Sequence, residues 1–161
     1  GTFPVFQYKQ DDVNIKGVDF LYNQSIVHHY EVILKASTLK GVNKKSKGGL
    51  IYMPPLNIGF GFSYINEKLL FFKDIKIGFD YTITAKQNNI VVQEDFTDSP
   101  SAFHLFNVNY SFKQKVSKYQ FQYLIKVENL FDLRYRDYLN RMRYFADEMG
   151  RSISMKIQLI F

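Results

Sequence analysis

The sequence contains no cysteine and no tryptophan, and none of its apolar runs is long. Without cysteine the chain forms no disulfide and offers no thiolate ligand to a metal ion. No run approaches the ~20 apolar residues that a membrane-spanning helix requires. Hydrolase motifs such as Gly-x-Ser-x-Gly are also missing. These absences disfavour disulfide-stapled, helical membrane and catalytic proteins, and we predict that the chain is not an enzyme and holds no cofactor.

Aromatic residues are plentiful instead, with 16 Phe and 12 Tyr among 161 residues. The net charge is only +6, and Lys and Arg are spread along the chain. Nucleic-acid-binding proteins typically gather their basic residues into a patch or stripe. We therefore expect no nucleic-acid partner.

A two-residue alternation marks the end of the sequence, where residues 150–161 read GRSISMKIQLIF. Every second residue from Ile153 to Phe161 is apolar, and the residues between them are polar as far as Gln158. This period predicts a β-strand with one apolar and one polar face. The same alternation occurs in six further segments, at residues 17–23, 30–37, 57–64, 74–85, 106–112 and 119–127. The sequence thus predicts seven strands, and residues 3–8 (FPVFQY) are the candidate for an eighth.

The predicted connections alternate in length along the chain. The short ones are residues 27–29, 66–72 and 114–118, and the long ones are residues 42–55, 87–101 and 132–149. Antiparallel strands with short turns at one end and long loops at the other are typical of transmembrane β-barrels, whose short turns are periplasmic and whose long loops are external. The predicted fold class is therefore all-β, an antiparallel transmembrane β-barrel segment of about seven to eight strands.

The direction of the apolar face distinguishes a membrane barrel from a soluble one. A soluble lipid-binding barrel also alternates, with its apolar side chains inside. Phe and Tyr near the strand ends suit the aromatic girdles of a membrane interface, and charges with glycines on the other face suit a wet lumen. We therefore expect the apolar face to contact outer-membrane lipid. Seven residues are predicted to face that lipid: Ile75, Phe79, Tyr81, Phe121, Ile125, Ile157 and Leu159.

Residues 127–161, VENLFDLRYRDYLNRMRYFADEMGRSISMKIQLIF, carry a family resemblance. The segment starts with a short motif that leads into a long loop. After the loop come a Gly-Arg pair, an alternating strand and a terminal Phe. The residues of the motif are Asn129, Leu130, Phe131, Asp132 and Tyr135. This segment closely resembles the C-terminal end of TonB-dependent outer-membrane receptors, particularly those of Bacteroidetes-type bacteria. Weaker matches, in order, are FPVFQY at 3–8, KGVDF at 16–20, the prolines at 54–55 and SPSAFHLFNVNYSF at 99–112.

The resemblance implies a location in the bacterial outer membrane and a role in importing a scarce ligand. Such receptors are barrels of about 22 strands, closed by a plug domain and energised through TonB. Their usual ligands include ferric siderophores and haem, which are the expected cargo here. The terminal Phe161 resembles the signal read by the barrel-assembly machinery. Residues 1–161 would then be the C-terminal part of the barrel, with the plug, the earlier strands and the TonB-contacting segment upstream. The alternative is a complete small barrel of eight strands with an adhesive or hydrolytic role.

The loop at residues 132–149 combines basic and aromatic residues, and six of them are candidate ligand contacts: Arg134, Arg136, Arg141, Arg143, Tyr138 and Tyr144. One interpretation is an external site for an anionic ferric chelate or haem propionate, bound by charge-assisted hydrogen bonds and stacking. The other is a packed loop in which nearby Asp and Glu neutralise the arginines. Residues 87–101 carry Glu94, Asp95 and Asp98, which could bind a cation, but we expect an acidic, solvated loop.

Overall fold

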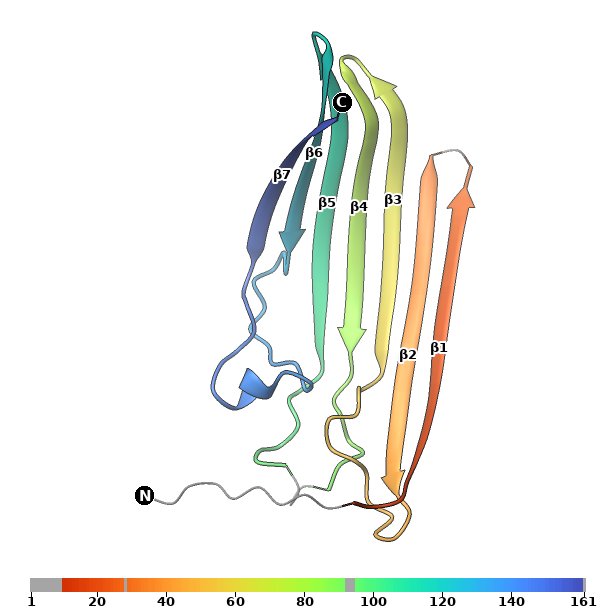
Figure 1. Ribbon diagram of the computed structural model, residues 1–161, viewed down its shortest axis with the longest axis vertical. Coiled ribbons are helices and arrows are strands. Elements are labelled where there is room, and N and C mark those ends of the chain that lie inside the picture. Colours follow the sequence, from red (N-terminus) through yellow and green to blue (C-terminus); the bar gives the residue numbers. More distant parts are fainter. Residues whose placement is uncertain (1–9, 28, 92–94, 161) are drawn as a thin grey trace.

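The computed structural model describes residues 10–27, 29–91 and 95–160. These residues form one antiparallel sheet whose spatial order follows the sequence (Figure 1). Its strands are β1 (Val13–Ile26), β2 (Tyr30–Asn43), β3 (Asn57–Leu69), β4 (Phe72–Thr84), β5 (Phe103–Val116), β6 (Tyr119–Glu128) and β7 (Ser152–Ile160). The seven predicted strands are confirmed. The candidate eighth strand at residues 3–8 lies outside the described residues.

The connections follow the predicted alternation of short turns and long loops. The connections after β1, β3 and β5 are short and lie at one end of the sheet, and those after β2, β4 and β6 are long and lie at the other (Figure 1). The last loop contains a single-turn 3-10 helix, η2 (Arg141–Tyr144). In the described part of the chain, no helix has the length and apolar character needed to cross a membrane.

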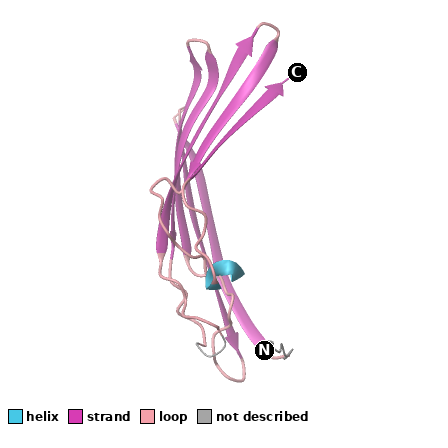
Figure 2. Ribbon diagram, turned by 90° about the vertical axis from the view of Figure 1, so that its left-hand side faces the viewer, coloured by secondary structure: helices cyan, strands magenta, loops and turns pink. Residues whose placement is uncertain are grey.

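The sheet is a single curved layer without a second layer packed on it (Figure 2). Only three hydrophobic side chains are buried among the described residues, namely Ile75, Phe103 and Tyr138. The chain exposes 12255 Å², whereas a compact monomer of its mass exposes about 8,400 Å². The sheet therefore has no core of its own, and its apolar side chains need a cover from outside this segment.

One face of the sheet is apolar, and cross-strand pairing aligns its side chains. Phe60 is paired with Tyr81, and Phe62 with Phe79. Tyr81 also lies against Phe106 of β5, with ring centroids 4.4 Å apart. Such cross-strand aromatic pairs stabilise a sheet. We call this side the apolar face.

The opposite side, the polar face, carries charged side chains that reach across strands. Lys76 of β4 forms an ion pair with Glu31 of β2 at 2.6 Å, across β3. The side-chain amide of Asn109 donates to Asp80 at 3.0 Å. Glycines make room for these chains: a Cβ added at Gly78 would lie 2.5 Å from Asn109 Oδ1. The alternation of the sequence is thus preserved as two chemically different faces.

A β-bulge interrupts the alternation at the turn end of β4. The register between β4 and β5 shifts between Lys73 and Lys76, and Asp74 has φ of 49°. The extra residue in β4 changes the local direction of the side chains. Ile75 keeps its pairing with Asn66 of β3, in phase with Ile77 and Phe79, but it is only 5% exposed. The side predicted for Ile75 thus agrees with its pairing, but neighbouring side chains leave it little surface to present to lipid.

The first hairpin is displaced along the sheet toward the long-loop end (Figure 1). The pairing of β2 with β3 ends at Ser37 and Asn57, whereas β2 stays paired with β1 as far as Asn43. Stagger of this kind is what strand tilt in a barrel requires. Among the described residues, β1 and β7 each pair with one strand only, so the sheet is open.

Candidate functional site in the loop cluster

The three long loops meet at one end of the sheet, and together we call them the loop cluster (Figure 1). They fold toward the polar face. The side-chain amide of Asn89 donates to the carbonyl of Gly41, and a Cβ at Gly41 would meet Leu50 and Met53. Gly41 is an even number of residues away from Glu31 and the other polar-face residues of β2, so it faces the same side of the sheet. The cluster therefore lies over the polar side of the sheet.

Arg143 is the centre of the loop cluster, in the loop for which the sequence left both a ligand site and a packed loop open. It is only 2% exposed. Its Nη2 donates to both carboxylate oxygens of Asp95, at 2.9 and 2.6 Å, and Nη1 donates to Thr97 Oγ1 at 3.2 Å. Its Nε donates to the Tyr138 carbonyl at 3.0 Å. The guanidinium is thus occupied by hydrogen bonds within the protein.

Tyrosines complete the arginine–aspartate pair and bring in the first loop. The hydroxyl of Tyr144 donates to Asp95 at 2.7 Å and lies 3.0 Å from the hydroxyl of Tyr52. The guanidinium of Arg143 lies 4.3 Å from the ring centroid of Tyr144 and 4.8 Å from that of Tyr138. The amide of Tyr52 donates to the Tyr138 hydroxyl at 3.3 Å. All three long loops are therefore joined by one buried polar network.

The network shifts the acidity of its members. Burial alone would raise the pKa of the Asp95 carboxyl, but hydrogen bonds from Tyr144 and Arg143 and the charge of Arg143 outweigh it, so the pKa lies below its ordinary 3.8. Burial, with hydrogen bonds to Tyr52 and Asp95, raises the pKa of Tyr144 far above 10. Asp95 is therefore ionised and Tyr144 protonated at neutral pH, as their hydrogen bonds require.

The Asn-Leu-Phe-Asp motif at 129–132 anchors the third loop to the sheet. Asn129 is 4% exposed with φ of 51°, its amide donates to Asn107 Oδ1, and its side chain exchanges hydrogen bonds with the backbone of Leu133. Asp132 Oδ1 accepts from the amide of Arg151 at 2.8 Å. A Cβ at Gly150 would come within 2.5 Å of that oxygen. The motif and the Gly-Arg pair therefore act together to close the loop at its base.

The six predicted ligand contacts separate into two groups. Arg143 and Tyr138 are each 2% exposed, and Tyr144 is half-buried in the same network. Their chemistry is satisfied internally, which fits the packed-loop interpretation of these three residues. The expected ligand contact is corrected for Arg143 and Tyr138, because burial leaves them no surface to present.

The other three arginines stay at the surface. Arg136 forms a half-exposed ion pair with Asp147 at 2.6 Å, and Arg141 lies over the ring of Tyr52 at 5.2 Å from its centroid. Arg134 is exposed at the rim of a depression of about 270 Å³, also lined by Tyr135 and Arg136. Arg134 and Arg141 are thus the members of the set best able to meet a ligand from outside.

Sequence reasoning missed Asp95, Thr97 and Tyr52. The loop of Asp95 was expected to be solvated, but its carboxylate is 1% exposed beneath Arg143. No local signal links Asp95 to Arg143, because 48 residues separate them. Among the described residues, no group of three or more His, Cys, Asp or Glu is placed to hold a metal ion. The loop cluster thus combines a buried polar network with exposed arginines at its surface.

The sequence matches no protein family and no curated protein. Among solved structures, the fold resembles that of the copper transporter OprC, with a TM-score of 0.76 at 22% sequence identity. The similarity covers 91% of this chain and 23% of the transporter. The chain therefore spans about a quarter of the length of the structure it resembles, and it has the fold of a β-barrel segment.

Proposed function

We propose that this chain forms part of the wall of a TonB-dependent transporter in the bacterial outer membrane, with its long loops outside the cell. The observation that carries the proposal is the uncovered apolar face on a single-layer sheet. Phe79, Phe20 and Ile157 are each more than half exposed, and large exposed apolar patches mark sites that contact membrane or protein. A bilayer supplies the missing cover.

The polar face and the loops support a transport barrel over a small closed one. Ion pairs such as Glu31–Lys76 line the polar face, as expected of a wet lumen. The loops fold toward that face, where they would narrow the mouth. The fold likeness to a copper transporter is consistent with this role. In this proposal the plug domain, the remaining strands, TonB and outer-membrane lipid are the partners, and the barrel-assembly machinery inserts the chain.

For the cargo we propose an anionic metal chelate, a ferric siderophore or haem. Arg134 and Arg141 are exposed at the loop cluster, and a guanidinium pairs well with carboxylates and other planar anionic oxygen ligands. The buried network would hold the loops in a fixed shape, so little ordering would be needed on binding. We propose no enzymatic activity for the chain.

The test of the proposed function uses the full-length protein in its own cells. Membrane fractionation is expected to place it in the outer membrane. Uptake of a ferric hydroxamate chelate, haemin and a copper salt should be compared with and without TonB. TonB-dependent uptake of one of these probes supports the proposal. A protein outside the outer membrane, or hydrolase activity without uptake, would refute it.

Replacing the two exposed arginines tests the site itself. We expect Arg134→Gln with Arg141→Gln to weaken binding of the transported chelate about tenfold or more, since a charge-assisted hydrogen bond contributes roughly 1.5–3 kcal/mol. Isothermal titration with the purified full-length protein measures the effect. The matched control is Lys86→Gln, which removes an exposed charge in the neighbouring loop. Equal affinities in all three proteins would remove these arginines from the site.

A further inference from the structure

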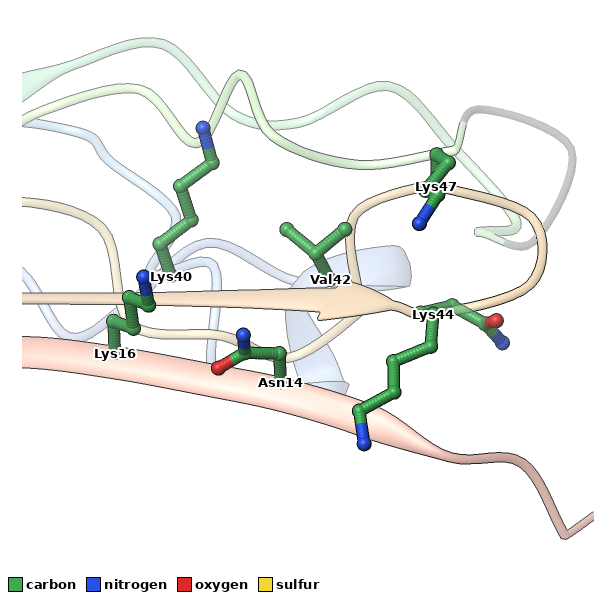
Figure 3. A pocket seen from close by; sticks show the side chains of 7 residues that line it. Asn14, Lys16, Lys40, Val42, Lys44 and Lys47 are labelled. Atoms are coloured by element: carbon green, nitrogen blue, oxygen red, sulfur yellow. The ribbon is translucent and has the colours of Figure 1, made fainter.

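A group of lysines lies at the long-loop end of the first hairpin. Lys16 of β1, Lys40 of β2, and Lys44 and Lys47 of the following loop surround a hollow of about 380 Å³ (Figure 3). Asn14, Val42 and Asn43 complete its lining. We call these four lysines the lysine patch.

The lysine patch begins on the apolar face of the sheet. Lys16 and Lys40 are directly paired across the two strands, and Val18 pairs with Thr38 one step nearer the sheet centre. Lys16 has the same parity as Val18 and Phe20, so these side chains point to the same side. Neighbouring residues of opposite parity, such as Gly41, face Leu50 and Met53 of the loop cluster. Lys16 and Lys40 thus point to the side of the apolar band, where Lys44 and Lys47 of the first long loop share their hollow.

The lysine patch also lies at a defined height on that face. Val18 and Phe20, which precede it, are 68% and 52% exposed and belong to the apolar band. Lys16 is four residues beyond Phe20, or about 13 Å along the strand. Lys40 lies beyond Ser37, the last residue of β2 that pairs with β3. The lysines therefore follow the apolar band where a bilayer changes from acyl chains to headgroups.

The charge of the lysine patch is not neutralised within the described residues. None of its four lysines is among the ion pairs that these residues form. The side chain of Asp11, just before β1, accepts a hydrogen bond from Asn43, and the carbonyl of Asp12 accepts from the Lys44 amide. When the carboxylates of Asp11 and Asp12 are counted against the four lysines, a net positive charge remains around the hollow.

We propose that the lysine patch binds the phosphate groups of a phosphorylated glycolipid headgroup in the outer leaflet. This inference rests on the outer-membrane location proposed above. Lysine suits the role because its apolar stem can lie along the barrel while its ammonium group reaches the headgroup layer. Several such charges around one hollow match a headgroup with more than one phosphate. The bound lipid would hold the first hairpin at a fixed depth in the membrane.

The test is a lipid-binding titration of the full-length protein in detergent micelles, in which native mass spectrometry measures the bound lipid. The probes are bisphosphorylated lipid A, the same lipid without phosphates, and inorganic phosphate. We expect Lys16→Gln with Lys40→Gln to weaken binding of the bisphosphorylated lipid about 25-fold, near fivefold for each basic residue. A second double variant, Lys44→Gln with Lys47→Gln, should give a loss of similar size.

The control is Lys68→Gln with Lys115→Gln, which removes the same charge near the short turns. Selective loss in the patch variants, with the dephosphorylated lipid bound weakly by all proteins, supports the proposal. It is overturned if the patch variants bind like the wild type, if phosphates make no difference, or if inorganic phosphate shows the lysine dependence and the lipid does not. Membrane fractionation separates the two proposals: an outer-membrane protein with lysine-independent binding refutes only this one, and any other location refutes both.

Discussion

Arg143 shows how a single side chain holds distant loops together. Its guanidinium and the Asp95 carboxylate are each 1% exposed, and they meet at 2.6 Å. A buried ion pair of this kind adds little over a well-packed apolar pair, but losing one partner leaves a charge buried without compensation. The stability of the loop cluster therefore depends strongly on keeping both members.

Replacing Arg143 tests this dependence. We expect Arg143→Met to lower the free energy of loop opening by about 3 kcal/mol, because Asp95 keeps its burial and loses its partner. Hydrogen exchange of the full-length protein should then show the Tyr52 amide, which donates to Tyr138, exchanging roughly 100-fold faster. The control is Arg134→Met, at an exposed position of the same loop. It should change the free energy of loop opening by less than about 0.5 kcal/mol. Equal protection in both variants would show that the network does not hold the loops.

The pKa of Asp95 sets the acid limit of the loop cluster. Because its pKa is lower in the folded protein than its ordinary 3.8, its contribution to stability is complete above that value and is lost as the pH falls through the lower folded pKa. Tyr144, with a raised pKa, contributes below about 10 and loses its contribution as the pH rises further. Pepsin cleavage of the loops, followed across pH 3.8, should increase on the acid side in the wild type. The Asp95→Asn variant should lack this step; an unchanged step would assign it to another group.

At the scale of the strand, two-residue alternation was enough to predict all seven elements, because each strand separates two different environments. The sequence did not reveal the bulge in β4. Asp74 continues the polar series there, and only its φ of 49° shows that the series is broken. The strand ends were also underestimated: β1 begins at Val13, where Lys16 and Asn14 break the apolar pattern but keep the pairing with β2. Pairing is a long-range property, which periodicity within one segment does not contain.

Site-directed spin labels test the direction of the apolar face. With the full-length protein in a bilayer, labels at six positions should be accessible to oxygen and protected from a water-soluble nickel complex. These positions are Phe79, Tyr81, Phe121, Ile125, Ile157 and Leu159. Labels at Asp80 and Lys126, on the polar face, are the controls and should show the reverse. Nickel access at the six apolar positions would mean that this face is wet.

The loop cluster was predictable only in part. The base of the third loop follows from its local motif, because Asn129 bonds to Leu133 four residues away. The partners of Arg143 come from another loop and are chosen by the packing of the whole cluster. From the sequence, Arg143 and Arg134 looked alike, although one is buried and the other exposed. Burial in loops depends on tertiary contacts, so composition alone did not separate the anchor from the surface residue.

At the scale of the whole molecule, the segment depends on its surroundings. Among the described residues, few apolar side chains are buried, and the edge strands β1 and β7 each pair with one strand only. Unpaired edges invite foreign pairing, and the uncovered face invites aggregation in water. In the proposed outer-membrane setting, correct insertion is therefore as important to this chain as the strength of its internal contacts.

Assembly is expected to depend on the terminal Phe161, which lies outside the described residues. We predict that deleting Phe161 lowers the amount of full-length protein in the outer membrane several-fold, because its apolar, aromatic end would no longer be recognised by the assembly machinery. Quantitative immunoblots of membrane fractions measure the change. Phe161→Tyr keeps an aromatic terminus and should preserve the wild-type level. A deletion that also preserves that level would exclude a signalling role for this residue.

The glycines of the polar face have a consequence for what passes along it. At Gly59 the nearest atoms to an added Cβ belong to Lys35, and at Gly61 to Asp80 and Ile33. Charged chains can therefore recline against the backbone instead of standing upright from the sheet. The charges of the polar face therefore lie close to its backbone. In the barrel proposed above, the lumen would be wider by the volume that these glycines lack.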